Sequence, residues 1–439
     1  MHINSPLDET RDTNLFTPFL HSPHTHSPPS NRPINTLQHA QAILVVPRSH
    51  RLITWAKPIT TKDALSYPSE PDAQASCRTF YADIYAKTNF NIDLKSVLGG
   101  PPANQQELTE RQIQAVAAGS TVQEQIFTAP RISVNGTYSL WFEYCEPKEG
   151  APRGVYQAHH GIVGNAGYWN VHSDDYLTYS FAENAAAAGW ATLSYDRLGV
   201  GRSAKPDGTN VVQAAFEIAQ SVAIAQKHRD GTLSGVGKID KIVGIGHSYG
   251  SALVTGLASV SPTSFDAIVL TGFTNNVTLG SLGLTALQLT IASVAYPDRF
   301  EGLPNDYVIS ASSAADQVVF FHYPNYTQDA FEEFTRTKGE FILGQFTITN
   351  DRTNYKNPLF VDVGEYDAPV CTANCSITSI VPTEQIPNPS QLDSTRELFP
   401  SVENFQTYVI PDTAHGINYS PTARLAYEKI FDFVEGLGL

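Results

Sequence analysis

Hydrophobic and polar residues alternate with two different periods along most of the chain beyond residue 120. Short apolar runs bounded by glycine or polar residues predict strands, and apolar residues spaced three to four apart predict helices. The predicted strands cover residues 121–129, 136–145, 154–160 and 190–195, the apolar run from Lys241, and residues 267–270, 358–363 and 404–410. The predicted helices cover residues 107–118, 176–188 and 211–226, the segment that follows Gly250, and residues 423–434.

Strands that alternate with helices at this spacing predict an α/β fold, with a mostly parallel eight-stranded sheet flanked by helices. The Asn135-Gly136 dipeptide lies between the first two predicted strands. Because this dipeptide favours tight turns, a hairpin is expected around residues 134–136.

The same patterns divide the chain into five parts. Residues 1–50 are rich in Pro, Ser, His and Asn, which predicts a disordered or loosely attached tail. Residues 51–120 have a mixed pattern and are expected to form an N-terminal extension. Residues 121–273 and 356–439 carry the regular alternation and form the two parts of the core. The alternation breaks over 274–355, an aromatic-rich insertion after the sixth strand that predicts a helical cap, or lid, over a site.

The apolar run from Lys241 ends in Gly-His-Ser-Tyr-Gly, residues 246–250. A Gly-x-Ser-x-Gly motif between a strand and a helix is typical of a nucleophile elbow, a strained turn that exposes a serine hydroxyl. Glycines two residues before and after the serine leave room for the crowded backbone. Ser248 is therefore the candidate nucleophile.

A serine hydroxyl is a poor nucleophile and needs a base, which in turn needs an orienting acid. His415 follows the last predicted strand and is the candidate base, while Asp367 follows the seventh strand and is the candidate acid. Glu365 and Asp362 lie close enough in the sequence to remain alternatives, in that order. The chain order Ser, Asp, His is the one expected in this kind of sheet.

Acyl transfer also requires hydrogen-bond donors for the oxygen that becomes negative, usually two backbone N–H groups. One is predicted at Tyr249, directly after the nucleophile. The other is predicted at Ile162, in the loop after the third strand. The neighbouring His160 is interpreted as a structural residue that braces this loop.

In order along the chain, these motifs resemble those of the α/β-hydrolase superfamily over about residues 121–439. They are the elbow, His160-Gly161, the run Ser194-Tyr195-Asp196-Arg197-Leu198-Gly199-Val200-Gly201-Arg202-Ser203, Gly364-Glu365-Tyr366-Asp367, and His415. The resemblance implies that residues 196–203 form a structural turn beside the site. Gln157 and His159 depart from the apolar residues that the family usually has in the third strand.

The run from Tyr195 and the pair Cys371 and Cys375 are also similar to filamentous-fungal members of the family, some secreted and some acting on secondary metabolites. A serine at the elbow disfavours the dehalogenases and epoxide hydrolases of the family, which use aspartate there. The resemblance therefore implies a serine hydrolase that cleaves an ester or lactone of a medium-sized apolar molecule without a cofactor or metal. A lyase or cyclase of a biosynthetic pathway that uses the same triad is the alternative.

Composition restricts the partners further. The formal net charge of −15 disfavours nucleic acid, so a small-molecule substrate is expected. No apolar run approaches the roughly 20 residues of a membrane span, and residues 1–20 lack the pattern of a signal peptide. This predicts a cytoplasmic protein. Secretion is the alternative, because Cys371 and Cys375 are close enough to pair and because Asn-x-Ser/Thr sites occur at Asn135, Asn276, Asn325, Asn374 and Asn418.

Overall fold

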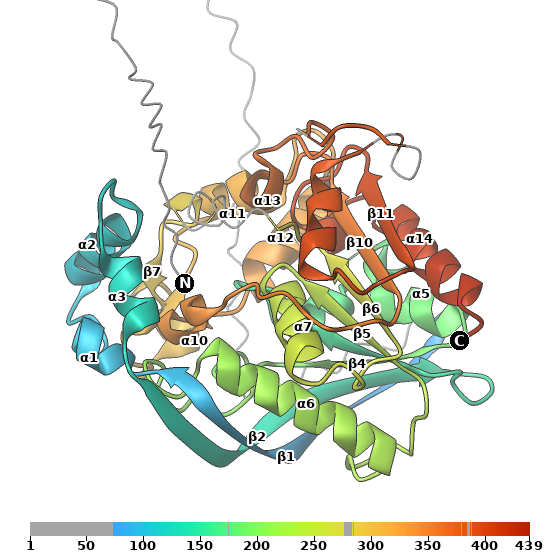
Figure 1. The fold of residues 1–439 in the computed structure, drawn as a ribbon, viewed down its shortest axis with the longest axis horizontal. Coiled ribbons are helices and arrows are strands. Elements are labelled where there is room, and N and C mark those ends of the chain that lie inside the picture. Colours follow the sequence, from blue (N-terminus) through green and yellow to red (C-terminus); the bar gives the residue numbers. More distant parts are fainter. Residues whose placement is uncertain are drawn as a thin grey trace, which may run out of the picture. The chain divides into compact units, whose positions relative to one another are not determined.

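The structure is a computed structural model that describes residues 73–439 except 174, 276–282, 284, 379, 384–386 and 388. The tail predicted over residues 1–50 lies outside the described residues. An eight-stranded sheet forms the centre, in the order β1-β2-β4-β3-β5-β6-β10-β11 (Figure 1). Its strands are β1 (Ala75–Ile92), β2 (Arg131–Pro147), β3 (Val155–His159), β4 (Ala191–Tyr195), β5 (Ile242–His247), β6 (Ala267–Thr271), β10 (Leu359–Gly364) and β11 (Phe405–Ile410).

The strands from β4 to β11 in this order run parallel, whereas β2 pairs antiparallel with both β1 and β4. This confirms the predicted α/β fold with a mostly parallel sheet. Because the carboxyl ends of the parallel strands meet at one edge, the loops that follow β3, β5, β10 and β11 are brought to the same side of the molecule.

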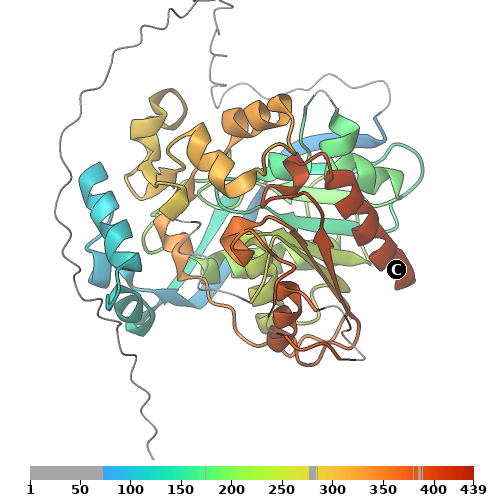
Figure 2. The same ribbon diagram turned by 90° about the horizontal axis from the view of Figure 1, so that it is seen from above.

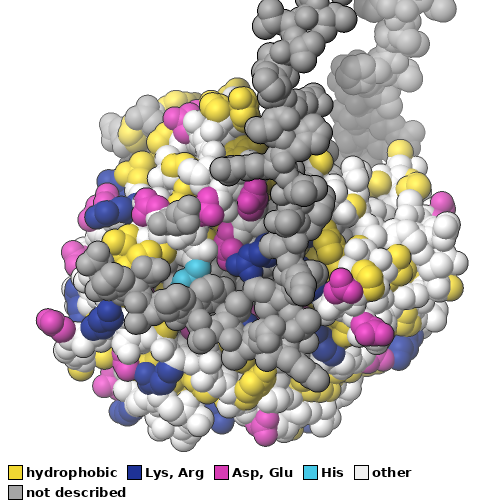
Figure 3. Space-filling model, turned by 180° about the vertical axis from the view of Figure 1, so that it is seen from behind, with side chains coloured by type: hydrophobic (Ala, Val, Ile, Leu, Met, Phe, Trp, Pro, Cys, Tyr) yellow, Lys and Arg dark blue, Asp and Glu magenta, His cyan; other side chains and the backbone are white. Residues whose placement is uncertain are grey.

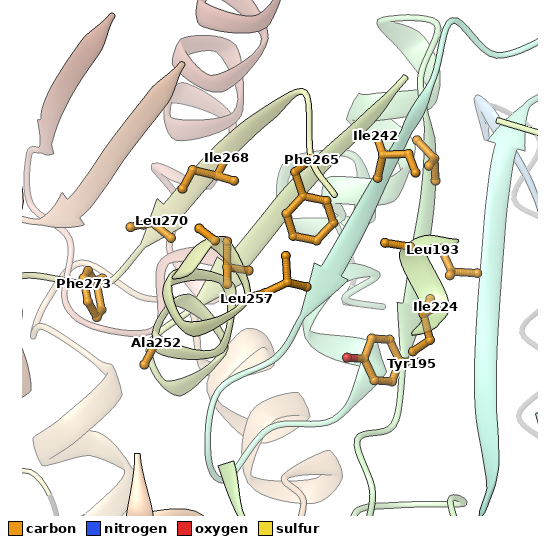
Figure 4. Close-up of a cluster of buried hydrophobic side chains, with 14 of the residues drawn as sticks. Leu193, Tyr195, Ile224, Ile242, Ala252, Leu257, Phe265, Ile268, Leu270 and Phe273 are labelled. Carbon is orange, nitrogen blue, oxygen red and sulfur yellow. The ribbon is translucent and has the colours of Figure 1, made fainter. Parts of the chain in front are cut away.

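Helices α6 (Ala214–Asp230) and α7 (Tyr249–Val260) cover one face of the sheet. Ile242 of β5 packs there in a buried cluster with Ile224 of α6 and Leu257 of α7 (Figure 4). The next residue of β5, Val243, belongs instead to a cluster on the opposite face, with Tyr427 of α14 (Ala423–Gly436). Since alternate side chains of a strand point to opposite faces, both faces are buried.

On that second face, the predicted helix over 176–188 is divided into α4 (Tyr176–Tyr179) and α5 (Phe181–Ala187). The division occurs at Ser180, whose hydroxyl oxygen accepts a hydrogen bond from the Glu183 N–H at 3.1 Å. An N-cap of this kind starts a new helix because it satisfies a donor that has no partner within the helix.

The predicted strand over 121–129 is wrong, because residues 122–128 form the helix α3 (Val122–Thr128). Its apolar residues Val122 and Ile126 are four apart, which is the helical spacing. The predicted turn at 134–136 is also wrong. Asn135 and Gly136 lie inside β2, where they pair with Lys87 and Ala86 of β1.

Strand β1 takes the place of the strand predicted over 121–129. It comes from the segment 51–120, which was predicted to lie outside the core, and it forms the edge of the sheet beside β2 (Figure 1). Cys77 of β1 and Cys145 of β2 are direct partners in the register and form a disulfide. The β1–β2 ribbon is thus fixed both by its ladder and by a covalent bond.

Helices α1 (Leu94–Leu98), α2 (Gln105–Val116) and α3 follow β1 and lie beside the insertion (Figure 2). Helix α2 confirms the helix predicted over 107–118. The Gln105 side-chain amide donates to the Leu289 carbonyl and accepts from the Ile291 N–H, both at 2.9 Å. The segment before β2 therefore supports the insertion as well as the sheet.

The insertion between β6 and β10 contains both helices and strands. Its described residues form β7 (Thr290–Ile291), α9 (Ala292–Ala295), α10 (Pro297–Phe300), β8 (Tyr307–Ile309), α11 (Ser313–Phe320), α12 (Gln328–Thr337), β9 (Phe341–Ile342) and η3 (Leu343–Thr347). Strands β7, β8 and β9 form a three-stranded antiparallel sheet. The insertion is therefore mixed, where the sequence predicted helices alone.

A buried ion pair joins two helical segments of the insertion. The Lys338 ammonium lies 2.8 Å from Asp316 Oδ2, and neither side chain is exposed. Lys338 also donates to the Ser310 hydroxyl at 2.9 Å. Because a buried charge is costly without partners, this arrangement holds the end of α12 against α11.

The surface of the described residues carries charges of both signs. Figure 3 shows hydrophobic side chains interspersed with acidic and basic ones on one face. Among the described residues, no helix is both long enough and apolar enough to cross a bilayer.

Candidate active site

Ser248 lies at the junction of β5 and α7, at the carboxyl edge of the sheet. Its backbone has φ 55° and ψ −116°, a conformation that is strained for any residue other than glycine. A Cβ added at Gly246 would lie 2.4 Å from the Gly250 backbone, and one added at Gly250 would lie 2.1 Å from the His159 carbonyl oxygen. The two glycines of the motif are thus required by close backbone contacts.

The backbone of Ser248 is held firmly while its hydroxyl is left available. The Ser248 N–H donates to the Thr271 carbonyl at 2.9 Å, and the Ser248 carbonyl accepts from the Ala252 N–H at 3.1 Å. Within residues 73–439 as described, the Ser248 hydroxyl forms no hydrogen bond. Hydrogen bonds to a nucleophile are often long in an enzyme without substrate.

His415 and Asp367 form a buried pair in the loops after β11 and β10. His415 Nδ1 lies 2.6 Å from Asp367 Oδ2, and the two residues are almost fully buried. Because the carboxylate is an acceptor, the Nδ1 atom carries the proton and Nε2 is left as the free acceptor of the ring.

The Asp367 carboxylate is positioned by its own loop. Its Oδ1 accepts from the Val370 N–H at 3.1 Å, which makes Asp367 the N-cap of α13 (Ala368–Cys371). Directly afterwards, Cys371 and Cys375 form a disulfide, the pairing that the sequence left open. The Cys375 N–H donates to the Glu365 carbonyl at 3.0 Å, so the bridge closes the loop around Asp367.

The two alternative acids face elsewhere. Glu365 Oε2 accepts from the Asp412 N–H at 3.1 Å. Asp362 lies inside β10, fully buried, and neither of its carboxylate oxygens has a hydrogen-bond partner among the described residues. Burial raises the pKa of Asp362 well above its usual range. Only Asp367, of the three candidates, contacts His415.

Ser248 and His415 lie against the same short segment, residues 271–272. The Ser248 N–H donates a hydrogen bond to the Thr271 carbonyl, and a Cβ added at Gly272 would lie 3.2 Å from His415 Cε1. The ring of His247 packs beside the ring of His415, with their centroids 4.8 Å apart. Burial lowers the pKa of His247 well below its usual value, so a neutral ring lies beside the base.

The loop after β3 lies directly against the elbow. A Cβ added at Gly161 would be 3.2 Å from Ser248 Cβ. Among the described residues, no acceptor meets the N–H of Ile162 in this loop or the N–H of Tyr249 at the start of α7. The structure therefore places the two predicted donor groups on neighbouring segments beside Ser248, with their N–H groups unused.

The polar residues of β3 that depart from the family pattern form hydrogen bonds to α6, although Gln157 Oε1 has no partner among the described residues. His159 Nε2 lies 2.6 Å from the Ser221 hydroxyl, and the Gln157 side-chain amide donates to the same hydroxyl at 3.0 Å. His160 Nε2 accepts from the Arg197 N–H at 3.2 Å, and its Nδ1 lies 2.8 Å from the Gly161 carbonyl oxygen. His160 thus connects the loop to residue 197, as a bracing residue would.

The insertion contacts both sides of the site. The Phe320 ring of α11 lies 5.7 Å from the His415 ring, and the Gly416 N–H donates to the Phe320 carbonyl at 2.9 Å. On the other side, the Gly339 N–H donates to the Val163 carbonyl at 2.9 Å. The insertion is therefore in contact with the loop of His415 and with the loop of Ile162.

One ion pair beside the site was missed by the sequence analysis. Arg197 Nη1 lies 2.6 Å from Glu217 Oε1, and their side chains are 1% and 3% exposed. The available signal was a glutamate among the small and apolar residues of the 214–219 segment. Because a charge on the buried face of a helix needs a partner, Glu217 alone indicated that a basic residue lies opposite.

Asp362→Asn is expected to change how stability depends on pH. At pH values above the usual aspartate pKa of 3.8, the folded protein retains a proton on Asp362 that the unfolded chain releases. The free energy of unfolding therefore decreases as pH rises through this window, and the asparagine variant lacks that decrease. Thermal unfolding of both proteins from about pH 4 to about pH 8 should show that the variant gains stability relative to the wild type as pH rises.

Asp240→Asn is the matched control for this measurement, because the Asp240 side chain is 82% exposed. Its unfolding temperatures should run parallel to those of the wild type. If the Asp362→Asn curve is also parallel to the wild type, Asp362 is ionised in the folded protein and the expected effect is absent.

Solved structures resemble the fold at low sequence identity. An alpha/beta hydrolase fold protein from Chitinophaga pinensis is 16% identical, with a TM-score of 0.43, over 67% of this chain and 94% of that one. A thermophilic esterase from Thermogutta terrifontis is 13% identical, with a TM-score of 0.39, over 69% and 94%. A proline iminopeptidase from Mycobacterium smegmatis is 14% identical, with a TM-score of 0.42, over 68% and 95%. No curated protein matches the chain.

A family model gives the clearest match. Residues 158–428 match the alpha/beta hydrolase family, a span of more than half the chain that begins in β3 and ends in α14. The resemblance to the α/β-hydrolase superfamily that was inferred from the sequence motifs is thereby confirmed. The chain belongs to the alpha/beta hydrolase family.

Proposed function

We propose that this protein is a serine hydrolase that cleaves a carboxylic ester or lactone of a medium-sized apolar molecule. The single observation that carries the proposal is the 2.6 Å contact between His415 and Asp367, beside a serine in a strained elbow. In this proposal Ser248 is the nucleophile, His415 the base and Asp367 the orienting acid. The N–H groups of Tyr249 and Ile162 bind the oxyanion.

In the first half of the reaction, the Ser248 hydroxyl oxygen attacks the carbonyl carbon of the ester. Its proton passes to His415 Nε2, and the π electrons of the carbonyl move to the oxygen, which the two N–H groups stabilise. Asp367 stabilises the imidazolium that forms. The carbon–oxygen bond to the alcohol then breaks, and His415 returns the proton to the leaving alkoxide.

In the second half, water attacks the acyl group on Ser248. His415 Nε2 takes a proton from the water, and the oxyanion forms at the same two N–H groups. The intermediate collapses, the bond to Ser248 Oγ breaks, and Ser248 regains its proton from His415. A lactone follows the same steps, except that its alcohol stays attached to the acid product.

The apolar surroundings of the site support an apolar substrate. Ile162 and Ile348 pack with Tyr249 and Leu253 on one side of the elbow. Phe320 and other aromatic residues of the insertion lie on the side of His415. Walls of this composition exclude water and bind hydrocarbon groups.

The proposal is tested with a fluorophosphonate probe and a panel of nitrophenyl esters of graded chain length. We expect Ser248 to be the labelled residue, identified by peptide mass spectrometry, and we expect medium-chain esters to be hydrolysed faster than acetate. Labelling without hydrolysis of any ester or lactone would favour a lyase or cyclase that uses the same triad. A protein that is not labelled would contradict the proposed nucleophile.

The contribution of the insertion is tested by repeating the panel with Phe320→Leu. Because Phe320 contacts the His415 ring, a smaller side chain should change the preferred chain length. Fluorophosphonate labelling should remain, since the elbow is untouched. An unchanged chain-length profile in a folded variant would mean that this part of the insertion does not select the substrate.

A further inference from the structure

One carbonyl oxygen in the loop after β3 lies within hydrogen-bond distance of two side-chain donors. The Gly161 carbonyl oxygen lies 2.8 Å from His160 Nδ1 and 3.3 Å from Arg197 Nη2. His160 Nε2 accepts from the Arg197 backbone N–H, so in the neutral ring the proton is on Nδ1 and is donated to Gly161. Burial lowers the pKa of His160 well below its usual value, in agreement with a neutral ring.

The orientation of this carbonyl determines where the next N–H group points. The Gly161 C=O and the Ile162 N–H belong to one planar trans peptide, in which they point in opposite directions. Holding the oxygen on the side of Arg197 therefore turns the Ile162 N–H to the other side. Gly161 lies against Ser248, since a Cβ added there would be 3.2 Å from Ser248 Cβ.

The Arg197 guanidinium, which contacts the Gly161 carbonyl, is itself held by Glu217 and packs against the ring of Tyr249. Arg197 pairs with Glu217 Oε1 at 2.6 Å, and its guanidinium carbon lies 4.6 Å from the centre of the Tyr249 ring. Glu217 Oε2 accepts from the Tyr249 hydroxyl at 2.7 Å. Gln345 of the insertion donates to Glu217 Oε1 at 3.0 Å. The same ion pair thus contacts the side chain of Tyr249 and the peptide of Ile162.

We propose that the Arg197–Glu217 ion pair is a positioning device that sets the Ile162 N–H and the Tyr249 N–H at the spacing required to bind one oxyanion. This inference rests on the proposed function and adds two residues to it. Neither side chain touches the substrate, because both are buried behind the loop. Arg197 acts through the Gly161 carbonyl, and Glu217 acts by holding Arg197 and Tyr249.

Arg197→Lys separates this role from simple stability. Lysine keeps the charge for Glu217, but its compact ammonium does not span Glu217 and Gly161 as a planar guanidinium does. Misplacing one oxyanion donor should lower kcat by about a hundredfold, while KM changes by less than about threefold. The variant should also lose preference for an ester over the matching thionoester, because sulfur is the poorer acceptor for these N–H groups.

Arg229→Lys is the matched control. Arg229 also joins a carboxylate, Asp266 at 2.9 Å, to a backbone carbonyl, that of Ser264 at 3.2 Å, but it lies at the amino ends of the strands. Its kcat and its ester preference should equal those of the wild type. If Arg197→Lys does not fold, Glu217→Gln serves instead. It keeps the shape but weakens the charge-assisted bonds, and should lower kcat by about tenfold with the same loss of preference.

The outcomes separate the two proposals. Suppose that the wild type is labelled at Ser248 and hydrolyses esters, and that Arg197→Lys has unchanged kcat and unchanged preference for the ester. This result overturns the positioning role and leaves the hydrolase function standing. A loss of kcat with an unchanged preference for the ester also overturns it, because general damage to the site would then explain the loss. A wild type that neither labels nor hydrolyses overturns both.

Discussion

Ser248→Ala should lower ester turnover by about a million-fold, the cost of removing the nucleophile from a triad. The remaining rate would come from the oxyanion donors and from substrate binding, which do not depend on the hydroxyl. The backbone bonds of Ser248 to Thr271 and Ala252 are formed by main-chain atoms and survive the change. The free energy of unfolding should therefore change by no more than about 0.5 kcal/mol.

The measurement is kcat with the best ester of the panel, with thermal unfolding of the same samples. Ser264→Ala is the matched control, because it removes only a hydroxyl that donates to the Ser261 hydroxyl, just beyond the far end of α7. It should retain wild-type activity. If Ser248→Ala keeps more than about a hundredth of the wild-type rate, Ser248 is not the nucleophile, and a mechanism in which His415 acts as base without acylation becomes the better explanation.

Most of the parallel part of the sheet was predictable because β3, β4, β5, β6 and β10 are buried on both faces. These five strands appear in the sequence as short, largely apolar runs, which is the pattern of a parallel sheet covered by helices, whereas β11 is a half-buried strand at the edge. Strand β1 gave no such pattern, since most residues from Ser76 to Lys87 are exposed or half-buried at the edge of the sheet. Its pairing with β2 depends on tertiary contacts that the local sequence does not encode.

The Asn135-Gly136 dipeptide shows how a local rule was overridden. It is typical of turns, yet here it continues a strand. A Cβ added at Gly136 would lie 2.9 Å from the ring of Tyr138. Glycine at this position leaves room for the ring of Tyr138, and a turn preference cannot distinguish that use of glycine from a hairpin.

Some residues of the candidate site could be predicted because the order of motifs along the chain defines their positions. Others could not, because their role depends on the direction in which the side chain points. Ser248 and His415 follow strands and occupy positions that the motif order defines. Asp362, Glu365 and Asp367 lie within six positions of one another, and only the course of the chain after β10 separates them. Arg197 and Glu217 are twenty positions apart, and their pairing requires the packing of α6 against the loops beside it.

Asp367→Asn should lower turnover by about ten-thousandfold while the fold remains intact. The Asp367 carboxylate has two partners, the Val370 N–H on Oδ1 and His415 Nδ1 on Oδ2. In the variant, the amide oxygen is needed by the Val370 N–H, so the amide NH2 group faces His415. A donor in that position forces Nδ1 to become an acceptor and moves the ring proton to Nε2, the atom that the proposed mechanism needs as an acceptor. The base then no longer accepts the proton of the nucleophile.

Glu365→Gln is the matched control, because it makes the same carboxylate-to-amide change two residues away. Glu365 Oε2 accepts from the Asp412 N–H, and an amide oxygen performs that role equally well. Its turnover should stay within about twofold of the wild type, since surface substitutions of this kind change little. The decisive measurement is kcat of both variants at a saturating concentration of the same ester. A larger loss in Glu365→Gln than in Asp367→Asn would assign the acid to Glu365 and would mean that the loop closed by Cys371 and Cys375 rearranges when substrate binds.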